Sequence, residues 1–467
     1  RHWTWEATPP TTGQTLGKKT MLNSFCIGNK SNEAFCQSCH VGYGWKDGQF
    51  DFQAQSRVDC LVCHHGGGYR KPPGLAGEVP ATRTELPPGS GQFVGPIDLA
   101  QVAQGVGPTS IATCGSCHFY GGGGDGVKHG DLDSSLARAD RALDVHMAAQ
   151  GGAGFGCTTC HETEAHRIPG SLSAMTVADA QGAALRGAAA GRNLASCTSC
   201  HGDKPHRESL LAVQMLNRHT DVLACPACHV PHFARGGVPT KTGWDWSTAG
   251  QLSPEGKPFQ RKDDQGRVVY DSKKGDFTVG EKLVPDYVWF DGTVSYTLQG
   301  DRIDPTGVVR INRFHGTPGD PKARIWPVKR FTGQQPYDKV HRQLLVLHTA
   351  GNDDAAFWKH FDWPRALQAG AEASGQPFSG EFGFVKTEML WPLTHMVAPA
   401  AQSVKCGHCH SAQGRMKGVE GVYVPGRDAH PWIDRLGWLM VAGALAGVLL
   451  HAGARVLSAR RRGGHHG

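Results

Sequence analysis

Fourteen of the 15 cysteines fall into one pattern, Cys-x-x-Cys-His, which occurs seven times. The copies are Cys36, Cys39 and His40; Cys60, Cys63 and His64; Cys114, Cys117 and His118; Cys157, Cys160 and His161; Cys197, Cys200 and His201; Cys225, Cys228 and His229; and Cys406, Cys409 and His410. Two thiols three positions apart on a tight turn can add to the two vinyl groups of one haem, and the next residue, His, then supplies the proximal nitrogen. A single Cys-x-x-Cys pair would also suit a zinc site, a redox dithiol or half of a disulfide framework. Seven copies, each followed by His, predict seven covalently attached haems c.

Haem c is attached outside the cytoplasm, so the motifs predict a protein that works on the outer side of the cytoplasmic membrane. Thioether linkage there removes fourteen thiols that could otherwise form disulfides. Cys26 is left over, and an odd thiol in an oxidising compartment is either buried and inert or reactive. The sequence starts at Arg1 without a signal peptide, and we expect a processed or incomplete N-terminus.

The remaining histidines are candidates for the second axial positions. The chain has 25 histidines and 8 methionines, which predicts mostly bis-His haems of low potential rather than His/Met ligation. The candidate distal ligands are His146, His166, His206, His219, His232, His348 and His395. His166, His206 and His232 follow a proximal histidine so closely that each would ligate a neighbouring haem. The alternative for each candidate is a solvated histidine or one that bonds a haem propionate.

The charge balance argues against nucleic acid as a partner. The formal net charge is +7, and a ferric haem with two neutral axial ligands carries about −1 once its propionates are counted, so seven haems would roughly cancel it. The hydrophobic fraction is 39%, a thin supply of core side chains for 467 residues. We therefore expect porphyrins to fill much of the interior.

The motifs divide the chain into three parts ahead of its C-terminal segment. Residues 1–235 form a haem-dense domain with six motifs, residues 236–400 a haem-free segment that packs on the haem core, and residues 401–432 the last haem segment. The predicted fold is mainly α and irregular, organised around stacked haems, with minor β structure in the haem-free segment.

Two stretches of the haem-free segment have local signals. Residues Phe277–Leu298 alternate Val, Tyr, Trp and Phe around Asp291-Gly292, which indicates strands or a hairpin. Residues 355–370 read as a short helix interrupted near Pro364. The segment is expected to supply distal ligands; the alternative is an insertion with no ligand role.

The C-terminal segment predicts a membrane anchor. Leu436–Ala454 is apolar apart from His451 and, as a helix, would span about 28 Å, close to the hydrocarbon thickness of a bilayer. We place the transmembrane helix at 433–457 and a basic cytoplasmic tail at 458–467, because arginines follow the apolar run. The alternative is a buried core helix.

Several segments together resemble the octahaem tetrathionate reductase family. They are Phe25-Cys26-Ile27-Gly28, Cys39-His40-Val41-Gly42-Tyr43-Gly44-Trp45, Val58-Asp59-Cys60-Leu61-Val62-Cys63-His64, Cys117-His118-Phe119-Tyr120-Gly121, Gly126-Val127-Lys128-His129-Gly130-Asp131-Leu132-Asp133, Trp391-Pro392 and His395-Met396-Val397-Ala398-Pro399. The resemblance covers most of residues 1–430, and its most specific part is the glycine-rich run with Lys128.

The resemblance implies an enzyme whose active haem has His on one face and a lysine amine on the other, with a non-haem cysteine beside it. Lys128 matches that lysine, Cys26 that cysteine, and the active haem would be held by Cys36, Cys39 and His40. His129 and Asp131, with Asp133, would manage protons or orient Lys128; the alternative is that they cap the loop.

The chemistry of Lys128 can also be considered by itself. A lysine amine has a pKa near 10.4 and ligates poorly while protonated, but burial and iron coordination favour its neutral form. A labile amine can leave and open the iron to substrate. The alternative is a solvated loop lysine.

The sequence departs from that family in two respects. It has seven motifs instead of eight, and the family's first motif precedes a segment like the one that begins at His2, so we expect an eighth haem upstream of Arg1. The C-terminal membrane helix is also additional.

The leading functional hypothesis is a periplasmic, membrane-anchored reductase that splits tetrathionate into two thiosulfates, or acts on related sulfur or nitrogen oxyanions or hydroxylamine. A small inorganic anion would favour nearby cations such as Lys18 and Lys19. Its electron partner would be a membrane quinol-oxidising cytochrome or a periplasmic carrier. The alternative from another class is a non-catalytic electron-transfer cytochrome; a hydroxylamine-oxidising enzyme is less favoured, because no tyrosine stands out as its haem cross-link.

Overall fold

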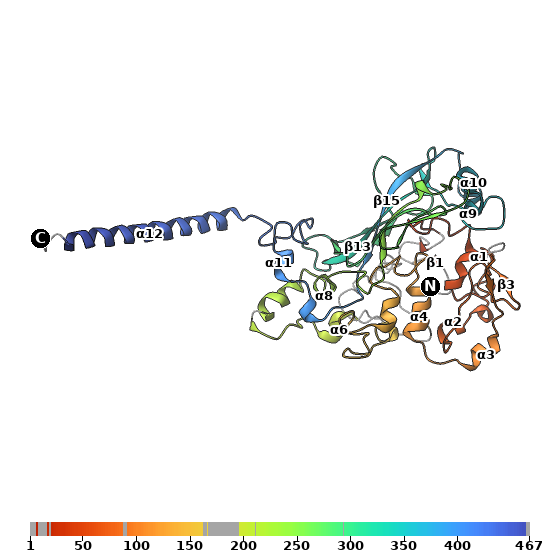
Figure 1. The fold of residues 1–467 in the computed structure, drawn as a ribbon, viewed down its shortest axis with the longest axis horizontal. Coiled ribbons are helices and arrows are strands. Elements are labelled where there is room, and N and C mark those ends of the chain that lie inside the picture. The colour runs from red at the N-terminus through yellow and green to blue at the C-terminus, as the bar shows by residue number, and fades with distance from the viewer. Residues whose placement is uncertain are drawn as a thin grey trace. The chain divides into compact units, whose positions relative to one another are not determined.

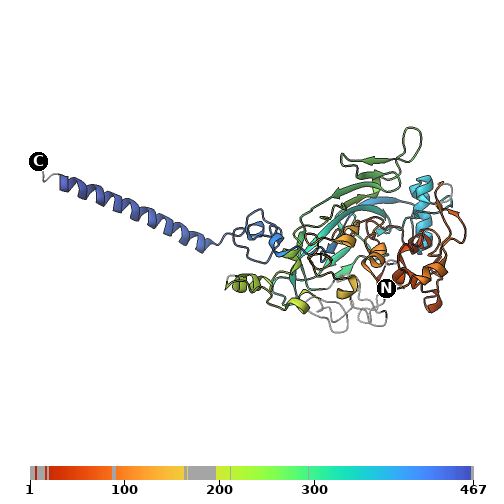
Figure 2. The same cartoon turned by 60° about the horizontal axis from the view of Figure 1, so that its bottom comes forward.

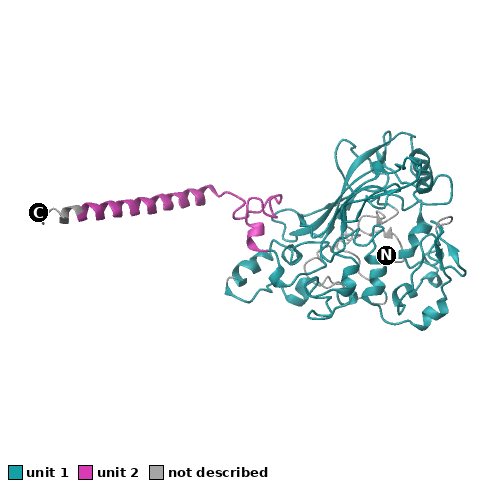
Figure 3. Cartoon of the chain, viewed as in Figure 1, with its two compact units in different colours: residues 1–404 teal, residues 405–467 magenta. Residues whose placement is uncertain are grey.

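The computed structural model describes residues 20–86, 91–161, 166, 196–210, 212–292 and 294–463, together with two short paired strands, β1 (Glu6–Ala7) and β2 (Leu16–Gly17). The chain forms two compact units, residues 1–404 and residues 405–467 (Figure 3). The larger unit contains both the haem-dense and the haem-free parts of the sequence. Lys18 and Lys19 lie outside the described residues.

Short helices carry the seven motifs. They are α1 (Glu33–Cys36) with η1 (Gln37–Cys39), α2 (Leu61–His64), α4 (Ile111–His118), α5 (Cys157–Cys160), α6 (Cys197–His201), α8 (Pro226–His229) and α11 (Cys406–Cys409). Between them lie α3 (Leu99–Gln104), α7 (Asn217–His219), the π-helix η6 (Ala212–Leu216) and the 3₁₀ turns η2 (Gln55–Arg57) and η3 (Ser134–Arg138). This part confirms the expected short helices joined by irregular backbone.

The haem-free segment forms a nine-stranded mixed sheet (Figures 1 and 2). Its main order is β11 (Val309–Arg310), β15 (Phe382–Pro392), β13 (Arg324–Asp338), β5 (Thr240–Asp245), β8 (Gly275–Gly280), β7 (Val268–Asp271) and β6 (Gln260–Lys262). The strands β9 (Asp286–Phe290) and β14 (Gln343–Leu344) also pair with β13. Smaller pairs join β10 (Val294–Tyr296) to β12 (Asn312–Phe314), and β3 (Thr84–Glu85) to β4 (Phe93–Val94).

The predicted minor β content was too small. The central strand β13 has 15 residues and pairs antiparallel with β15 from Val328↔Pro392 to Asp338↔Phe382. It is buried on both faces along much of its length, so its sequence lacks the alternation typical of a half-exposed strand. It also contains Pro327, Pro336 and a buried Lys329, residues that argue against a central strand when read from sequence alone.

Two local predictions for this segment hold in part. Strands occur within Phe277–Leu298, but β9 pairs with β13 and β10 with β12, so they do not form one hairpin. The predicted broken helix is the pair α9 (Phe357–His360) and α10 (Trp363–Ser374), which are separated by Phe361, with left-handed backbone, and Asp362. Pro364 lies in the first turn of α10, where a missing N–H is tolerated.

The segment that carries Cys26, residues 22–27, packs against the sheet. Leu22, Phe25 and Ile27 are buried in the main hydrophobic cluster of the sheet. Ser24 Oγ lies 2.9 Å from Gln335 Oε1 and 2.7 Å from Thr387 Oγ1. At Gly333 an added Cβ would lie 2.5 Å from Ser24 Oγ, so only glycine allows this close approach.

The smaller unit contains the last motif and one long helix, α12 (Pro431–Gly463). Its stretch Pro431–Ala459 is long and apolar enough to cross a membrane, and the mean hydropathy of its most apolar part is 1.7. Within the described part of the chain, none of its most apolar stretch is buried.

The remaining 3₁₀ turns among the described residues are η7 (Trp246–Thr248) and η8 (Ala400–Gln402), both in the larger unit.

Candidate haem sites and candidate active site

Each Cys-x-x-Cys-His motif lies on a helical turn. In such a turn residues three apart share one face, so the two thiols of each motif lie on the same side. The histidine N–H donates to the first cysteine's carbonyl oxygen at 3.1 Å in the Cys60 and Cys225 motifs and at 2.9 Å in the Cys157 and Cys406 motifs. The motifs thus share the local geometry that two-point attachment to a flat ring requires.

The second cysteines Cys200 and Cys228 have different surroundings. Cys200 is exposed, and Ser199 Oγ donates to its thiol at 3.9 Å. Cys228 is half-buried, and its carbonyl oxygen accepts from the Val404 N–H at 2.9 Å. The attachment roles of both cysteines remain predictions from the motif.

His410 lies in the smaller unit, just after α11. Its Nδ1 lies 3.1 Å from Pro425 O, so Nδ1–H donates and Nε2 is the nitrogen that would bind iron. The roles of His410 in haem binding and as an iron ligand remain predictions.

The predicted metal ligands do not form a metal site built from protein groups alone. Within the described ranges, no group of three or more His, Cys, Asp or Glu side chains could hold a metal ion. The roles of His410 and the other motif histidines as iron ligands remain predictions from the motif.

Four motif histidines face a second imidazole at a nearly constant distance. The ring centroids are 6.2 Å apart for His64 and His166, 6.1 Å for His201 and His146, 6.5 Å for His161 and His395, and 6.3 Å for His229 and His206. Two imidazoles that bind one iron from opposite sides, each with an Fe–N bond of about 2 Å, would have centres about 6 Å apart. These pairs therefore fit bis-His haems, and all four second members were among the predicted distal ligands.

Several of these rings are oriented through their other nitrogen. Nδ1 lies 3.0 Å from Gly107 O in His64, 3.1 Å from Asn217 Oδ1 in His206 and 3.3 Å from Asp131 Oδ2 in His395. Oxygens of this kind only accept, so Nδ1–H donates and Nε2 is left to bind a metal.

His65 is a buried histidine that the sequence reasoning missed. It is 7% exposed, and among the described residues neither ring nitrogen has a hydrogen-bond partner. A buried polar group without a partner costs about 1–3 kcal/mol, so the ring requires a partner beyond these residues. An axial position on a haem fits this need. The sequence feature that could have identified His65 is its position directly after His64. In that position its side chain points away from the haem of its own motif.

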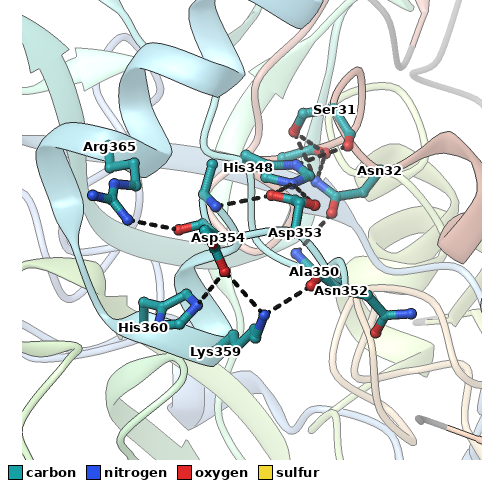
Figure 4. A network of polar contacts seen from close by, with 12 residues as sticks. Ser31, Asn32, His348, Ala350, Asn352, Asp353, Asp354, Lys359, His360 and Arg365 are labelled. Atoms are coloured by element: carbon teal, nitrogen blue, oxygen red, sulfur yellow. Dashed lines mark hydrogen bonds and ion pairs between the residues drawn. The ribbon is translucent and has the colours of Figure 1, made fainter.

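The predicted distal ligand His348 has polar partners at both ring nitrogens, and its ligand role remains a prediction. Its Nδ1 lies 3.1 Å from Ser31 O and its Nε2 2.9 Å from Asp353 Oδ2, so both nitrogens already have protein partners (Figure 4). Asn32 Oδ1 accepts from the Ala350 N–H in the same network. His348 therefore ties the segment before the first motif to the haem-free segment.

Two further candidates remain predictions. His219 ends α7, and His232 follows α8 by three residues. Their ligand roles rest on the sequence argument alone.

Neighbouring motifs lie close together. The thiols of Cys39 and Cys117 are hydrogen-bond neighbours, as are those of Cys114 and Cys157 and those of Cys197 and Cys225. These contacts connect the first motif to the third, the third to the fourth, and the fifth to the sixth. Groups attached at these cysteines would be close enough for electron hopping.

The glycine-rich run forms a tight loop around Lys128. Lys128 N–H donates to Gly121 O at 3.1 Å, and Gly126, with φ +64°, donates to Phe119 O at 2.9 Å. A Cβ added at Gly121 would lie 3.2 Å from Lys128 Cδ. The lysine side chain thus lies back against the loop's own backbone, and a larger residue at Gly121 would have to displace it.

Lys128 and the segment of Cys26 meet at Trp391. Lys128 Nζ lies 4.6 Å from the centre of the Trp391 ring, a cation–π contact. Phe25, which precedes Cys26, stacks on the same indole with centroids 5.9 Å apart. Cys26 itself is half-buried and packs against the same core. The fold thus brings both predicted catalytic residues to one region.

His129 belongs to the same region. Its ring packs edge-on against Trp391 with centroids 5.2 Å apart. Burial, and next the neighbouring charge of Lys128, hold the pKa of His129 well below its ordinary value. A neutral imidazole here is suited to hydrogen bonding more than to carrying a positive charge.

Asp131 faces His395. Its Oδ2 accepts from the N–H groups of Thr394 at 2.7 Å and His395 at 2.9 Å, in addition to the ring contact. Burial acts to raise the pKa of Asp131, but the hydrogen bonds and charge of His395 outweigh it and lower that pKa. Its hydrogen bonds orient a predicted distal ligand.

Asp133 caps η3. Its Oδ1 accepts from Ser135 N–H at 2.9 Å, which is the loop-capping alternative considered for it. Burial raises the pKa of Asp133 to about 6.

The sheet supplies a pair of cations that the sequence reasoning did not single out. Lys241 Nζ lies 3.2 Å from the centre of the Phe277 ring, and Lys274 Nζ lies 5.8 Å from that of Trp358. Burial, and next the charge of Lys274, lower the pKa of Lys241 to about 7. The lowered pKa favours the neutral amine of Lys241, and an anion bound nearby would oppose that effect.

Three comparisons with known proteins bear on these sites. A family described as "Cytochrome c bacterial" matches residues 241–413. A solved structure described as octaheme cytochrome c from Shewanella oneidensis is 39% identical with a TM-score of 0.76, and the match covers 90% of this chain and 89% of that one. An uncharacterized protein of Archaeoglobus fulgidus is 28% identical over 153 residues, 30% of this chain and 48% of that protein, so the match spans about half its length.

The fold, the helical turns that carry the motifs and the match to the bacterial cytochrome c family together define this chain as a multihaem c-type cytochrome. Such a protein is a redox protein with covalently bound haem c. More specifically, the chain belongs to the family of octahaem cytochromes c represented by the Shewanella structure. Kinship with a bacterial c-type cytochrome indicates an extracytoplasmic location.

Proposed function

We propose that the protein is a multihaem reductase that transfers two electrons to tetrathionate, or to a related sulfur or nitrogen oxyanion or hydroxylamine, at a haem held by Cys36, Cys39 and His40. The observation that carries the proposal is the meeting of Lys128 and the Cys26 segment at Trp391. The Cys39–Cys117 contact supports it, because Cys117 immediately precedes the stretch that leads into the Lys128 loop.

The seven motifs would hold seven haems. The imidazole pairs support His166, His146, His395 and His206 as distal ligands of the haems on His64, His201, His161 and His229. Bound haem iron supplies one-electron transfer and, at an open axial position, a place for substrate. Lys128 would occupy that position at rest, and the Trp391 face would stabilise its ammonium once it leaves.

The reaction balances when an electron donor supplies two electrons through the haems. Tetrathionate takes up two electrons, its central S–S bond breaks, and two thiosulfate ions leave. Cys26 would hold a substrate sulfur as a thiolate, and the cationic pair Lys241 and Lys274 would attract the dianion.

We further propose that α12 anchors the protein to the cytoplasmic membrane and brings it to a membrane electron donor. Pro431–Ala459 has the length and hydropathy for this, and arginines follow the apolar run.

A specific observation also favours the second candidate, a pure electron-transfer cytochrome. Four facing imidazole pairs describe haems with no open position, which suits conduction. The two candidates differ at Lys128 and Cys26.

The test is anaerobic turnover of the haem-loaded protein with reduced methyl viologen as donor and tetrathionate, nitrite or hydroxylamine as acceptor. Tetrathionate-dependent oxidation that collapses in Cys26→Ser supports the reductase. A fully haem-loaded protein without turnover on any acceptor supports the carrier.

The axial role of Lys128 has its own prediction. Lys128→Ala should abolish one low-spin EPR signal, that of a Lys/His haem, because alanine offers no ligand. The exposed Lys273→Ala is the matched control and should keep every signal. An unchanged spectrum in Lys128→Ala would show that Lys128 does not bind iron.

A further inference from the structure

Lys329 is a fully buried lysine that reaches from the sheet into the Lys128 loop. It lies on β13 and is 0% exposed. Its Nζ lies 2.7 Å from Val127 O, 3.3 Å from Lys128 O and 2.6 Å from Thr240 Oγ1. A lysine is rarely buried so completely unless its ammonium is fully satisfied.

The hydrogen-bond directions define the state of this amine. Thr240 Oγ1 donates its hydrogen to Gly126 O at 2.6 Å, so the same oxygen accepts from Lys329. The two carbonyl oxygens also only accept, and three acceptors require the three N–H donors of an ammonium. These three hydrogen bonds use every donor of the Lys329 side chain, so its end is held in one position against the loop.

Together the two side chains hold three successive carbonyls. Thr240 binds that of Gly126, and Lys329 binds those of Val127 and Lys128. The loop itself is rich in glycine and has much conformational freedom. Two neighbouring strands, β5 and β13, thereby restrict the backbone on which the Lys128 side chain depends.

We propose that Lys329, with Thr240, is a positioning residue: it holds the loop backbone so that the Lys128 amine can bind its iron. This inference rests on the axial role proposed above for Lys128.

Lys71 plays the corresponding part for the opposite ligand, His40. It is 1% exposed, and its Nζ donates to His40 O and to Gly42 O, the latter at 3.2 Å. A buried ammonium thus holds the backbone of each predicted ligand of the active haem.

The test is EPR of the haem-loaded full chain, wild type against Lys329→Met. The Lys/His signal should be lost or displaced while the bis-His signals stay, and kcat/KM should fall by about 10–100-fold, as for other residues that orient a metal ligand. Lys359→Met is the control for the loss of a lysine that donates to a backbone carbonyl, that of Asn352 at 2.8 Å, and it should keep the Lys/His signal.

The outcomes separate this inference from the proposed function. If the spectrum of Lys128→Ala lacks none of the wild-type signals, Lys128 is not an axial ligand. This inference then fails together with that role. A Lys/His signal that persists unchanged in Lys329→Met, or that disappears equally in Lys359→Met, overturns only the positioning role. If Lys329→Met does not load haem, Thr240→Val decides, since a displaced signal supports the inference and an unchanged one overturns it.

Discussion

Asp131 shows at the residue scale how one carboxylate can join two parts of the candidate site. It lies three residues after Lys128, yet its hydrogen bonds go to Thr394 and His395, far along the chain. A carboxylate that accepts from the second nitrogen of a metal-bound imidazole makes that imidazole a stronger donor and favours the oxidised metal. The carboxylate predicted to serve Lys128 is therefore placed to tune the haem proposed for His161 and His395.

Asp131→Asn should raise the reduction potential of that haem, because a neutral amide no longer favours the more positively charged iron through His395. The measurement is a spectroelectrochemical titration of the haem-loaded protein. Asp133→Asn is the neighbouring control, since Asp133 caps η3, and it should leave the potentials in place. An equal shift in both variants would contradict the specific role of Asp131.

At the scale of elements, the ends of the long strands are held by a single buried carboxylate. Asp338 is 0% exposed at the end of β13. It accepts from the N–H groups of Val340 at 2.9 Å, His341 at 2.7 Å and Ser379 at 2.7 Å. It thereby closes the turn from β13 to β14 and joins the segment that leads into β15.

Asp338 makes the stability of the sheet pH-dependent. Burial acts to raise its pKa, but the hydrogen bonds outweigh burial and lower the pKa to about 2. The unfolded value is about 3.9, so the stabilisation is present above about pH 4 and is lost as pH falls through 2. A shift of this size corresponds to about 2–3 kcal/mol.

Asp338→Asn should therefore lose about 2–3 kcal/mol of unfolding free energy at pH 7, and the difference from wild type should shrink between about pH 4 and pH 2. Denaturant unfolding at a series of pH values measures this. The exposed Asp264→Asn should change stability by less than about 0.5 kcal/mol. A pH-independent deficit in Asp338→Asn would mean that its charge is not the cause.

At the scale of the whole molecule, the division into two units separates the candidate active site from the apolar helix. Lys128, Cys26 and the four imidazole pairs all belong to residues 1–404, whereas α12 belongs to residues 405–467. The site region therefore has its own core, which includes Phe331, Trp246 and Leu367.

Deletion of residues 433–467 should release a soluble, fully haem-loaded protein, because none of the most apolar stretch of α12 is buried among the described residues. Membrane fractionation with a pyridine haemochrome assay measures both properties, and the full-length protein is the control. An unchanged membrane fraction after the deletion would refute the proposed anchor.

The sequence by itself determined the haem attachment motifs, the odd thiol Cys26 and the apolar helix. These are local patterns: the two thiols and the histidine of a motif lie within five residues, and a membrane helix is one uninterrupted apolar stretch. The resemblance added Lys128, which the fold places against Trp391.

Only the tertiary structure decided which histidines face one another and how large the sheet is. His161 meets His395, and His348 turns to Asp353, through contacts between distant segments that leave no mark on local spacing. β13 is a strand because neighbours cover both its faces, although its sequence has Pro and Lys where a strand pattern would not. Burial and pairing are properties of the folded chain, so the ligand pairs and the buried ammonium of Lys329 could be recognised only there.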